Sequence, residues 1–308
     1  MKTVNGSLNF KRLKTQNPVI TLGNFDGVHK GHQKIIKKAL QRAHALNTIA
    51  AVYTFDPHPL KVVKPDIAPP QITTFSEKAG ILESLGLDYL IKERFTKTFS
   101  EKTPEAFMIS VICERIRPCE IIIGHDYAFG KNRKGAVDLL ERIGANCNFR
   151  VHVVSDITTK NIPVRSTTIR QLVTAGKVSL AHKLLGRPYR LTGKVVHGHR
   201  RRIGFPTANL TPGSKLLIPE NGVYAIRVES QYGTHEGDVN VGINPTFDGT
   251  KKTIEAHMFN FNRDLYGKTI AISWYKRIRG EKKFKDTRHL AERIEKDIQF
   301  AKKYLANH

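Results

Sequence analysis

The first half of the chain alternates short apolar runs with segments of helical period. Residues 31–46 place apolar side chains three and four positions apart among lysines, which predicts a helix with one core face. Further helices are predicted at 76–85, with Ser76 as its cap, from Thr103-Pro104 onward and at 135–146. Residues 61–75 are predicted to be a loop. Buried strands are predicted at 19–22, 48–55, 89–91, 120–123 and 149–154. Strands that alternate with helices predict an α/β domain with a doubly wound parallel sheet.

The second half of the chain changes to a period of two. Short strands between Gly, Pro or Asn turns are predicted at 189–197, 222–230, 238–243, 253–259 and 269–275. A helix at 287–305 closes the chain, so this half is predicted to be a small antiparallel β-barrel with a closing helix. A short helix at 176–185 ends at Gly186-Arg187-Pro188. We therefore expect one domain at 1–186 and a second at 187–308.

The 308 residues contain no apolar run long enough to span a membrane, and the N-terminus lacks the apolar run of a signal peptide. The three cysteines, Cys113, Cys119 and Cys147, have neither metal-site nor disulfide-framework spacing. They are expected to be buried thiols of a protein in the reducing cytoplasm.

The formal net charge of +24 raises the question of a nucleic-acid partner. The basic residues are spread along the chain, and it has no Cys/His finger, basic-region heptad or aromatic RNA-binding signature. We favour a solvated basic surface that attracts polyanionic substrates such as ATP, and expect no dedicated nucleic-acid site.

A glycine-containing turn follows the first buried strand and reads G-N-F-D-G-V-H-K-G-H, from Gly23 to His32. Such a turn before a helix brings backbone N–H groups and the positive end of the helix dipole to a phosphate. His29 and His32 lie three apart, on one face of the first turn, where they can hydrogen-bond phosphate oxygens. The alternative is a surface loop with two solvated histidines.

Three further segments carry candidate chemistry. In T-F-D-P-H-P, His58 and Pro59 follow a strand at the edge of the sheet where ligands bind; the alternative is a proline-stiffened loop. G-H-D-Y-A-F-G places Asp126 after another strand, and S-T-T-I-R places Ser166, Thr167 and Arg170 at a helix start. That last segment suits a phosphate clamp, or is simply an N-cap with a surface arginine.

In order and spacing, these motifs resemble the FMN adenylyltransferase half of the bacterial bifunctional riboflavin kinase/FAD synthetase family. The resemblance implies a nucleotidyltransferase domain in which His29, His32 and Arg170 handle ATP phosphates. It also implies nucleotide-site and flavin-site residues, which are Gly23, Asn24, Phe25, Asp26, Asp126, Ser166 and Thr167 for ATP and His58 and Pro59 for flavin. The family usually has serine where this chain has Arg165, a bulky cation beside the clamp.

In the second half, Thr207 and Asn209 alternate along G-F-P-T-A-N and so point to one side of an extended chain. Two neutral oxygens beside a basic loop suit Mg²⁺ bound to nucleotide phosphates; the alternative is a polar strand edge. Glu255 lies in the apolar context I-E-A-H. It could be the base for a hydroxyl nucleophile or a salt-bridged strand residue.

The ordered set G-F-P-T-A-N, G-V-Y-A, N-V-G-I-N-P-T-F, I-E-A-H, D-L-Y-G and I-R-G-E-K-K-F resembles the riboflavin kinase half of the same family. The resemblance implies Glu255 as base and Thr207 and Asn209 at magnesium. It also implies ATP contacts at Gly198 and Arg202, and flavin contacts at Arg279 and Phe284. The loop 199–202 is shorter than the family's and lacks its glycine.

The resemblance implies ATP-dependent phosphorylation of riboflavin to FMN and adenylylation of FMN to FAD. Two alternatives stay open. One is a single-activity enzyme in which Arg165 or the 199–202 loop impairs the other site; the other is a flavin- or nucleic-acid-binding regulator on the same fold. The expected partners are riboflavin, FMN and ATP, with no membrane; a weak homo-oligomer is left open.

Overall fold

The computed structural model describes residues 1–12, 17–197, 207–213, 216–246, 249–282 and 284–308. Contacts divide the chain into two compact units. The first comprises Met1–Pro69 and Thr74–Arg165, and the second comprises Pro70–Thr73 and Ser166–His308. Within the described residues, no helix has the length and apolar character that crossing a membrane requires.

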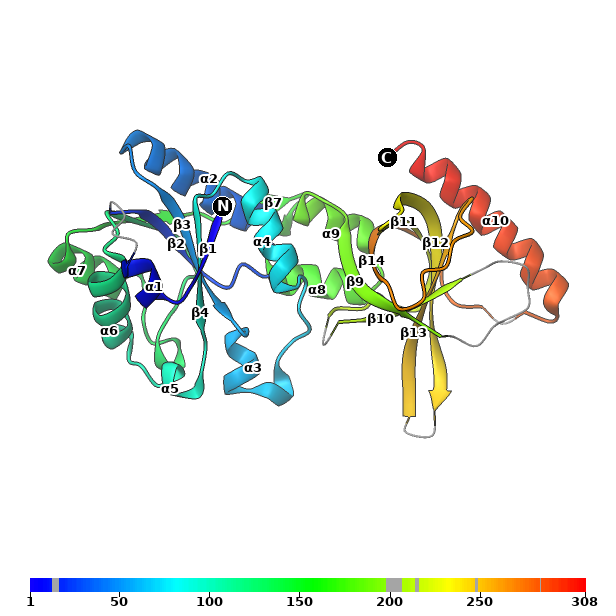
Figure 1. Ribbon diagram of the computed structural model, residues 1–308, viewed down its shortest axis with the longest axis horizontal. Helices are drawn as coiled ribbons and strands as arrows, with labels where there is room; N and C mark the ends of the chain where they lie inside the picture. Colours follow the sequence, from blue (N-terminus) through cyan, green and yellow to red (C-terminus); the bar gives the residue numbers. More distant parts are fainter. Residues whose placement is uncertain (13–16, 198–206, 214–215, 247–248, 283) are drawn as a thin grey trace. The chain divides into compact units, whose positions relative to one another are not determined.

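The first unit is built on six parallel strands in the order β1-β4-β3-β2-β5-β6. Figure 1 labels β1, β2, β3 and β4 among the helices of this unit. Their bounds are β1 Lys2–Asn5, β2 Val19–Leu22, β3 Ala50–Asp56, β4 Tyr89–Arg94, β5 Glu120–Gly124 and β6 Arg150–Val154. The predicted α/β class and parallel sheet are confirmed. The edge strand β1 was not predicted, because its four residues bury only Val4 and show little apolar pattern.

Helices cover both faces of this sheet. Their bounds are α1 Ser7–Arg12, α2 Lys30–Ala45, α3 Pro59–Val63, η1 Pro65–Ile67, α4 Phe75–Ser84, α5 Lys97–Ser100, α6 Pro104–Phe107, the π-helical η2 Met108–Ile116, η3 Lys131–Arg133 and α7 Val137–Cys147. A two-stranded ribbon, β7 Thr158–Thr159 and β8 Ile162–Pro163, follows. On one face Ile121 and Ile123 pack with α1, η2 and α7, whereas on the other Ile122 packs with α2 and α4. This alternation explains why residues 121–123 of β5 are all isoleucine.

Two local predictions in this unit need correction. The segment 61–75 was expected to be a loop, but it contains the end of α3 and the short helix η1. Thr74, and not Ser76, caps α4, because Thr74 and Glu77 form a reciprocal capping box. Thr74-Phe75-Ser76-Glu77 offers two candidate caps, and only Thr74 has a glutamate at the third helical position.

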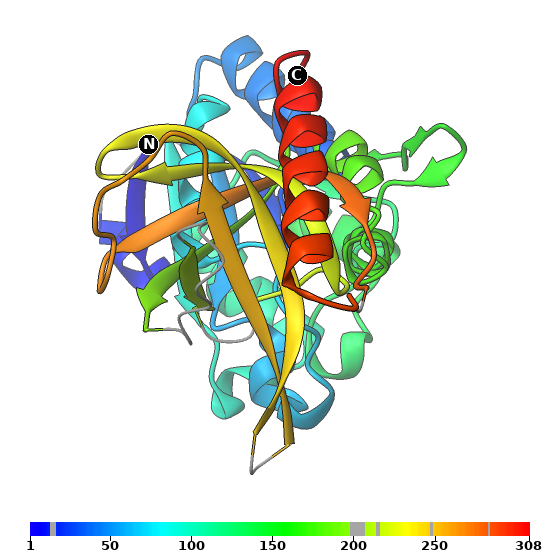
Figure 2. The same cartoon turned by 90° about the vertical axis from the view of Figure 1, so that its right-hand side faces the viewer.

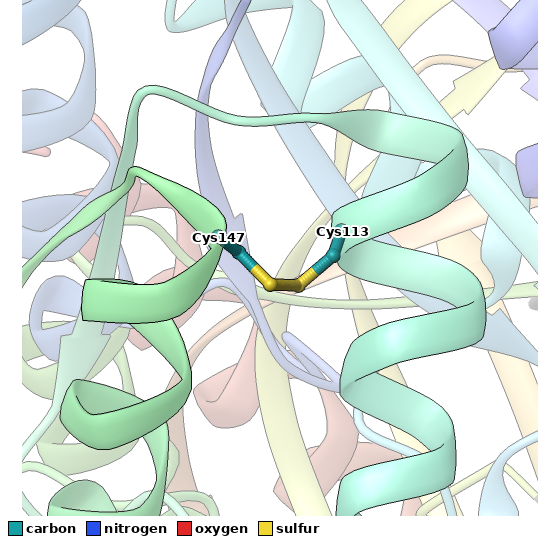
Figure 3. The surroundings of a disulfide bond; sticks show 2 residues. All are labelled: Cys113 and Cys147. Carbon is teal, nitrogen blue, oxygen red and sulfur yellow. A yellow bond between two sulfur atoms is a disulfide. The ribbon is translucent and has the colours of Figure 1, made fainter.

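The prediction that all three cysteines are free thiols is wrong. Cys113 of η2 and Cys147 at the end of α7 form a disulfide, with their Cα atoms 5.9 Å apart (Figure 3). Cys119 is the free cysteine. The two bonded residues are 34 positions apart, and only the packing of η2 and α7 on one face of the sheet brings them together.

The second unit is a closed antiparallel barrel with three helices. Its strands follow the order β10-β13-β12-β11-β14-β9 and confirm the predicted barrel. The bounds are α8 Ser166–Thr174, α9 Val178–Leu185, β9 Tyr189–Val196, β10 Ala208–Pro212, β11 Gly222–Ser230, β12 Gly233–Thr246, β13 Gly249–Met258, β14 Thr269–Arg279 and α10 Thr287–Leu305. Figure 2 shows α10 lying along the outside of the barrel, beside β12.

The barrel interior is filled by large side chains. Trp274, Tyr189 and Tyr224 are fully buried, and the Tyr224 and Trp274 rings meet edge to face at 5.0 Å. Outside the barrel, α10 buries Ile298, Ala301 and Leu305 against Ala225 and Phe259. Helix α9 packs on β14 and β9, and α8 packs on α9, so residues 166–186 group with the barrel although the predicted domain boundary lies at 186.

Candidate active sites

The turn after β2 has an unusual backbone. Phe25, Gly27 and Val28 adopt positive φ angles of 49°, 84° and 37°. Left-handed backbone at a non-glycine residue costs about 1–3 kcal/mol and is tolerated only where the surroundings hold it. Phe25 and Val28 are held by burial, since their exposures are 2% and 0%. The turn from Gly23 to Val28 is therefore a fixed backbone structure between β2 and α2.

The two predicted histidines are brought together at the start of α2. His29 is the N-cap, and its Nδ1 accepts a hydrogen bond of 3.3 Å from the backbone N–H of His32. The imidazole rings stack 3.5 Å apart, and the ring of Phe25 packs against His32 edge to face at 5.2 Å. A side chain at Gly31 would come within 3.1 Å of His29 Nδ1, which explains the glycine between them.

Of the other predicted residues of the turn, Phe25 and Asp26 are buried, and Gly23 and Asn24 are half-buried. Asp26 is 5% exposed, and the ring of Phe25 lies within 3.2 Å of the position a Cβ would take at Gly23. The carbonyl of Asn24 accepts a hydrogen bond from the Thr54 hydroxyl. The backbone N–H of Gly23 donates to the carbonyl of Tyr53 at 3.2 Å, so Gly23 and Asn24 are tied to β3. The ring of Phe25 packs against His32.

The G-H-D-Y segment follows β5 and contributes His125 to a cluster of ion pairs. Arg165, the residue that departs from the family pattern, belongs to the same cluster. Arg165 donates to Asp156 through Nη2 at 2.5 Å and Nε at 3.2 Å, and His125 Nδ1 lies 2.9 Å from the same carboxylate. Ligand atoms of His125, Asp126 and Asp156 lie within 4.8 Å of one another. Burial alone would raise the pKa of Asp156, but the hydrogen bond from Arg165 holds this pKa below its ordinary value. The charge of Arg165 is therefore already paired.

The P-H-P segment begins directly after β3. His58 caps α3 by accepting the backbone N–H of Leu60 at 3.2 Å, and Pro59 is the first helical residue. The next residues expose apolar side chains, with Val63 50% and Ile67 70% exposed. Exposed apolar side chains beside the ligand edge of a parallel sheet suit an aromatic ring system.

Ser166, Thr167 and Arg170 belong to the second unit. Ser166 and Thr167 form the first turn of α8, as expected, and Arg170 lies one turn in. Arg170 Nε donates to the carbonyl of Pro70 at 2.8 Å. Their role toward phosphate stays a prediction.

A pocket of about 470 Å³ lies on the barrel and is lined by four of the predicted kinase residues, Thr207, Glu255, Arg279 and Phe284. Glu255 on β13 lies directly opposite Asn209 on β10 and Asn240 on β12. Residues directly opposite in antiparallel strands share one face, so the carboxylate stands between two amides. Thr207 lines the same pocket. Three neighbouring strands thus gather a carboxylate and neutral oxygen ligands at one place.

Arg279 and Phe284 lie together at the wall of this pocket. The Arg279 guanidinium lies 5.6 Å from the centre of the Phe284 ring, and its Nε donates to Asp297 at 2.7 Å. Asp297 is 2% exposed and also pairs with Arg293 at 3.1 Å. The buried carboxylate of α10 therefore fixes the arginine that closes β14.

Sequence reasoning missed Asn240, Asp238 and His257, which also line the pocket. His257 Nδ1 lies 3.0 Å from Asp238. His257 follows Glu255 by two positions, so strand alternation could have placed it on the same face. Of the predicted residues, Gly198 and Arg202, with the 199–202 loop, lie outside the described residues.

A parallel-sheet unit with a histidine pair at a helix start, joined to a barrel with a carboxylate pocket, defines a two-site transferase of nucleotide phosphates. The family model for FAD synthetase matches residues 11–168, and the model for riboflavin kinase matches residues 185–305. The chain belongs to the bifunctional riboflavin kinase/FMN adenylyltransferase family.

Proteins with that name resemble the chain over its whole length. The one from Buchnera aphidicola subsp. Schizaphis graminum is 36% identical and covers 99% of both chains. The Bacillus subtilis protein is 38% identical over 94% of this chain and 93% of its own, and the Escherichia coli K12 protein is 33% identical over 99% and 98%. A Streptococcus pneumoniae crystal structure, titled a macrolide-efflux protein, is 31% identical, with TM-score 0.85 and coverage of 96% and 97%.

Proposed function

We infer that the protein phosphorylates riboflavin to FMN and adenylylates FMN to FAD with release of pyrophosphate, using ATP in both steps. The observation that carries this conclusion is the presence of two separate sites, each with its chemical groups assembled. On the barrel, Glu255 lies between two asparagines of the neighbouring strands, and the first unit stacks His29 on His32 at a helix start. Both family models and the full-length relatives support it.

In the kinase step, Glu255 is the proposed base. It orients the riboflavin 5′-hydroxyl and takes its proton late in a loose phosphoryl-transfer transition state. Thr207 and Asn209 are the proposed holders of Mg²⁺, since their oxygens are ligands that this ion prefers and both lie beside Glu255. The metal would neutralise charge on the ATP phosphates. Arg279 and Phe284 would hold the flavin, and Gly198 and Arg202 the phosphates.

In the adenylylation step, FMN phosphate attacks the α-phosphate of ATP, and charge develops on the phosphate oxygens. His29 and His32 are the proposed donors to that charge, assisted by the positive end of α2. Gly23, Asn24, Phe25, Asp26 and Asp126 form the proposed nucleotide site, with Ser166, Thr167 and Arg170 as phosphate ligands. His58 and Pro59 lie where the flavin is proposed to bind.

The single-activity alternative rested partly on Arg165. Its guanidinium is engaged with Asp156, so a free cation at this position is not the state of the folded chain. This pairing favours retention of adenylylation. We propose both activities, with the domain boundary at 186 and action in the cytoplasm, where ATP is available. The absence of a dedicated nucleic-acid site and any weak self-association stay predictions.

The test is to incubate the pure protein with Mg-ATP and either riboflavin or FMN, then separate the products. Riboflavin should give FMN and FAD, and FMN should give FAD with one pyrophosphate for each FAD. FMN from riboflavin with no FAD from FMN, or FAD from FMN with no product from riboflavin, would establish the single-activity alternative. Formation of neither, with flavin bound, would favour the regulator.

A further inference from the structure

Lys78 is a lysine buried inside the first unit. It lies on α4, which follows the P-H-P segment, and only 6% of it is exposed. Taking an ammonium group out of water is costly unless hydrogen bonds and opposite charge compensate for the loss. A lysine kept at such a position therefore calls for an account of its contacts.

The ammonium group of Lys78 contacts the backbone of the Gly23–Val28 turn. Nζ donates to the carbonyl of Asn24 at 2.9 Å and lies 3.5 Å from the hydroxyl of Thr54. The Thr54 hydroxyl itself donates to the same carbonyl at 3.3 Å. Side chains from α4 and β3 thus converge on one backbone oxygen of the turn.

The charged groups around Lys78 come from three elements. Asp26 of the turn and Asp56 at the end of β3 act on it through their negative charge. Burial nevertheless lowers the pKa of Lys78 to about 8, against the effect of both carboxylates. On β4, Lys92 lies 3.9 Å from Asp56 and 4.9 Å from the centre of the Phe75 ring, which Lys78 also faces at 5.5 Å.

The backbone oxygen that Lys78 contacts belongs to Asn24, the residue before Phe25. Asn24 precedes Phe25, whose backbone is left-handed and whose ring packs against His32. His32 in turn stacks on His29. A strained turn persists only where its surroundings fix it, so the anchor of Asn24 also sets where the two rings lie.

We propose that Lys78 is a positioning residue for adenylyl transfer, which holds the Gly23–Val28 turn from behind and thereby places His29 and His32. The proposal rests on the proposed function of the first unit. Lys78 acts through the backbone of the turn and needs no contact with ATP or FMN. A displacement of about 1 Å at a reacting centre can cost about 10²-fold in rate, so loss of the anchor should lower turnover.

The first test is Lys78→Met in the full chain, with Lys92→Met as the matched control. Methionine keeps the length of the side chain and removes the ammonium group, while Thr54 still satisfies the Asn24 carbonyl. We expect kcat for FAD formation from FMN to fall about 10- to 100-fold. The KM values for ATP and FMN should stay within about threefold, because the substrate-contacting groups remain. Lys92→Met should retain wild-type turnover.

The melting temperature separates positioning from a merely structural role. Because Lys78→Met removes a buried charge, the melting temperature should be unchanged or higher while turnover falls. A merely structural role predicts that the melting temperature and FAD formation fall together. Thermal unfolding reports whether the first unit is folded, and riboflavin kinase activity, which belongs to the second unit, should be unchanged in either case.

Thr54→Val alone keeps the proposal testable if Lys78→Met folds poorly, and where both variants fold they form a double-mutant cycle. Thr54→Val removes the second donor to Asn24 and should lower turnover several-fold; in the double variant the two losses should not multiply, because both act on one oxygen. Wild-type turnover in folded Lys78→Met, or independent losses in the cycle, would overturn the proposal. A wild-type protein that makes no FAD from FMN would instead refute the proposed function.

Discussion

Glu120 at the start of β5 is a buried charged residue whose ion pair makes the stability of the first unit depend on pH. Its side chain is 3% exposed and accepts two hydrogen bonds from Arg42 on α2, at 2.5 and 2.7 Å. The Nε2 atom of His152 lies 3.0 Å from Oε2 of Glu120. The hydrogen bond from Arg42 lowers the pKa of Glu120 below its ordinary value of 4.5.

This pairing predicts an acid-sensitive contribution to stability. Because the folded-state pKa is lowered, the unfolded chain binds the proton first as the pH falls. The contribution is therefore complete well above pH 4.5 and is lost as the pH falls below about 4.5, through the lower folded-state pKa. Glu120→Gln should cost about 1.5–3 kcal/mol at pH 7 and less at pH 3.5, measured by urea unfolding.

Glu101→Gln is the matched control, since Glu101 forms an exposed ion pair with Lys131 in the same unit. Exposed pairs contribute about 0–1 kcal/mol, so this change should be nearly neutral at both pH values. Equal losses for Glu120→Gln at pH 7 and pH 3.5 would mean that packing, and not the charge, stabilises this position.

At the scale of elements, the disulfide ties η2 to α7 on one face of the sheet. Closing a loop of 34 residues restricts the unfolded chain and is expected to stabilise the unit by about 3–4 kcal/mol. Replacing Cys113 and Cys147 by alanine should lower the free energy of unfolding by that amount. A reductant should produce a similar loss in the wild type and none in the variant.

Thiol counting checks the bond itself. The chain has three cysteines, so wild-type protein unfolded without reductant should show one reactive thiol, Cys119, and three after reduction. Three thiols before reduction would contradict the disulfide. The cysteine spacing could not predict this bond, because the partners meet only through packing of helices remote in sequence.

Helix α9 is expected to stabilise the second unit. It buries Val178, Ala181, Leu184 and Leu185, and Ser179 donates to the carbonyl of Tyr275 on β14 at 2.8 Å. Burial of one Val or Leu side chain contributes about 1.5–3 kcal/mol. A fragment of residues 166–308 should therefore be more stable than residues 187–308, by about 3 kcal/mol or more, in thermal or urea unfolding. Equal stability would make α9 a linker only.

For the whole molecule, period and motif order were enough to predict two architectures. The alternation of strands and helices predicted the parallel sheet, and the change to a period of two predicted the barrel. The strand-to-helix turn placed His29 and His32 correctly on one helix face, and they stack. The alternation of Thr207 and Asn209 likewise agrees with the position of Asn209 opposite Glu255.

What the sequence could not predict depends on contacts between distant segments. Lys78 looks like an ordinary helix lysine until α4 packs behind the turn, and Asp297 looks exposed until it meets Arg279. The role of Arg165 could not be interpreted from the sequence alone, because its partner Asp156 precedes the ribbon of β7 and β8 that lies between the two residues in the chain. The roles of the predicted site residues stay predictions, since geometry gathers them without showing a substrate.

The most direct test of two independent sites is a crossed comparison of Glu255→Gln and His32→Ala, each with riboflavin and with FMN as substrate. Glu255→Gln removes the base, so FMN formation should fall about 10²–10⁴-fold while FAD formation from added FMN is unchanged. His32→Ala removes a donor to the reacting phosphate, so FAD formation should fall about 10²–10³-fold while riboflavin still gives FMN. Both variants losing both activities in folded protein would contradict the account.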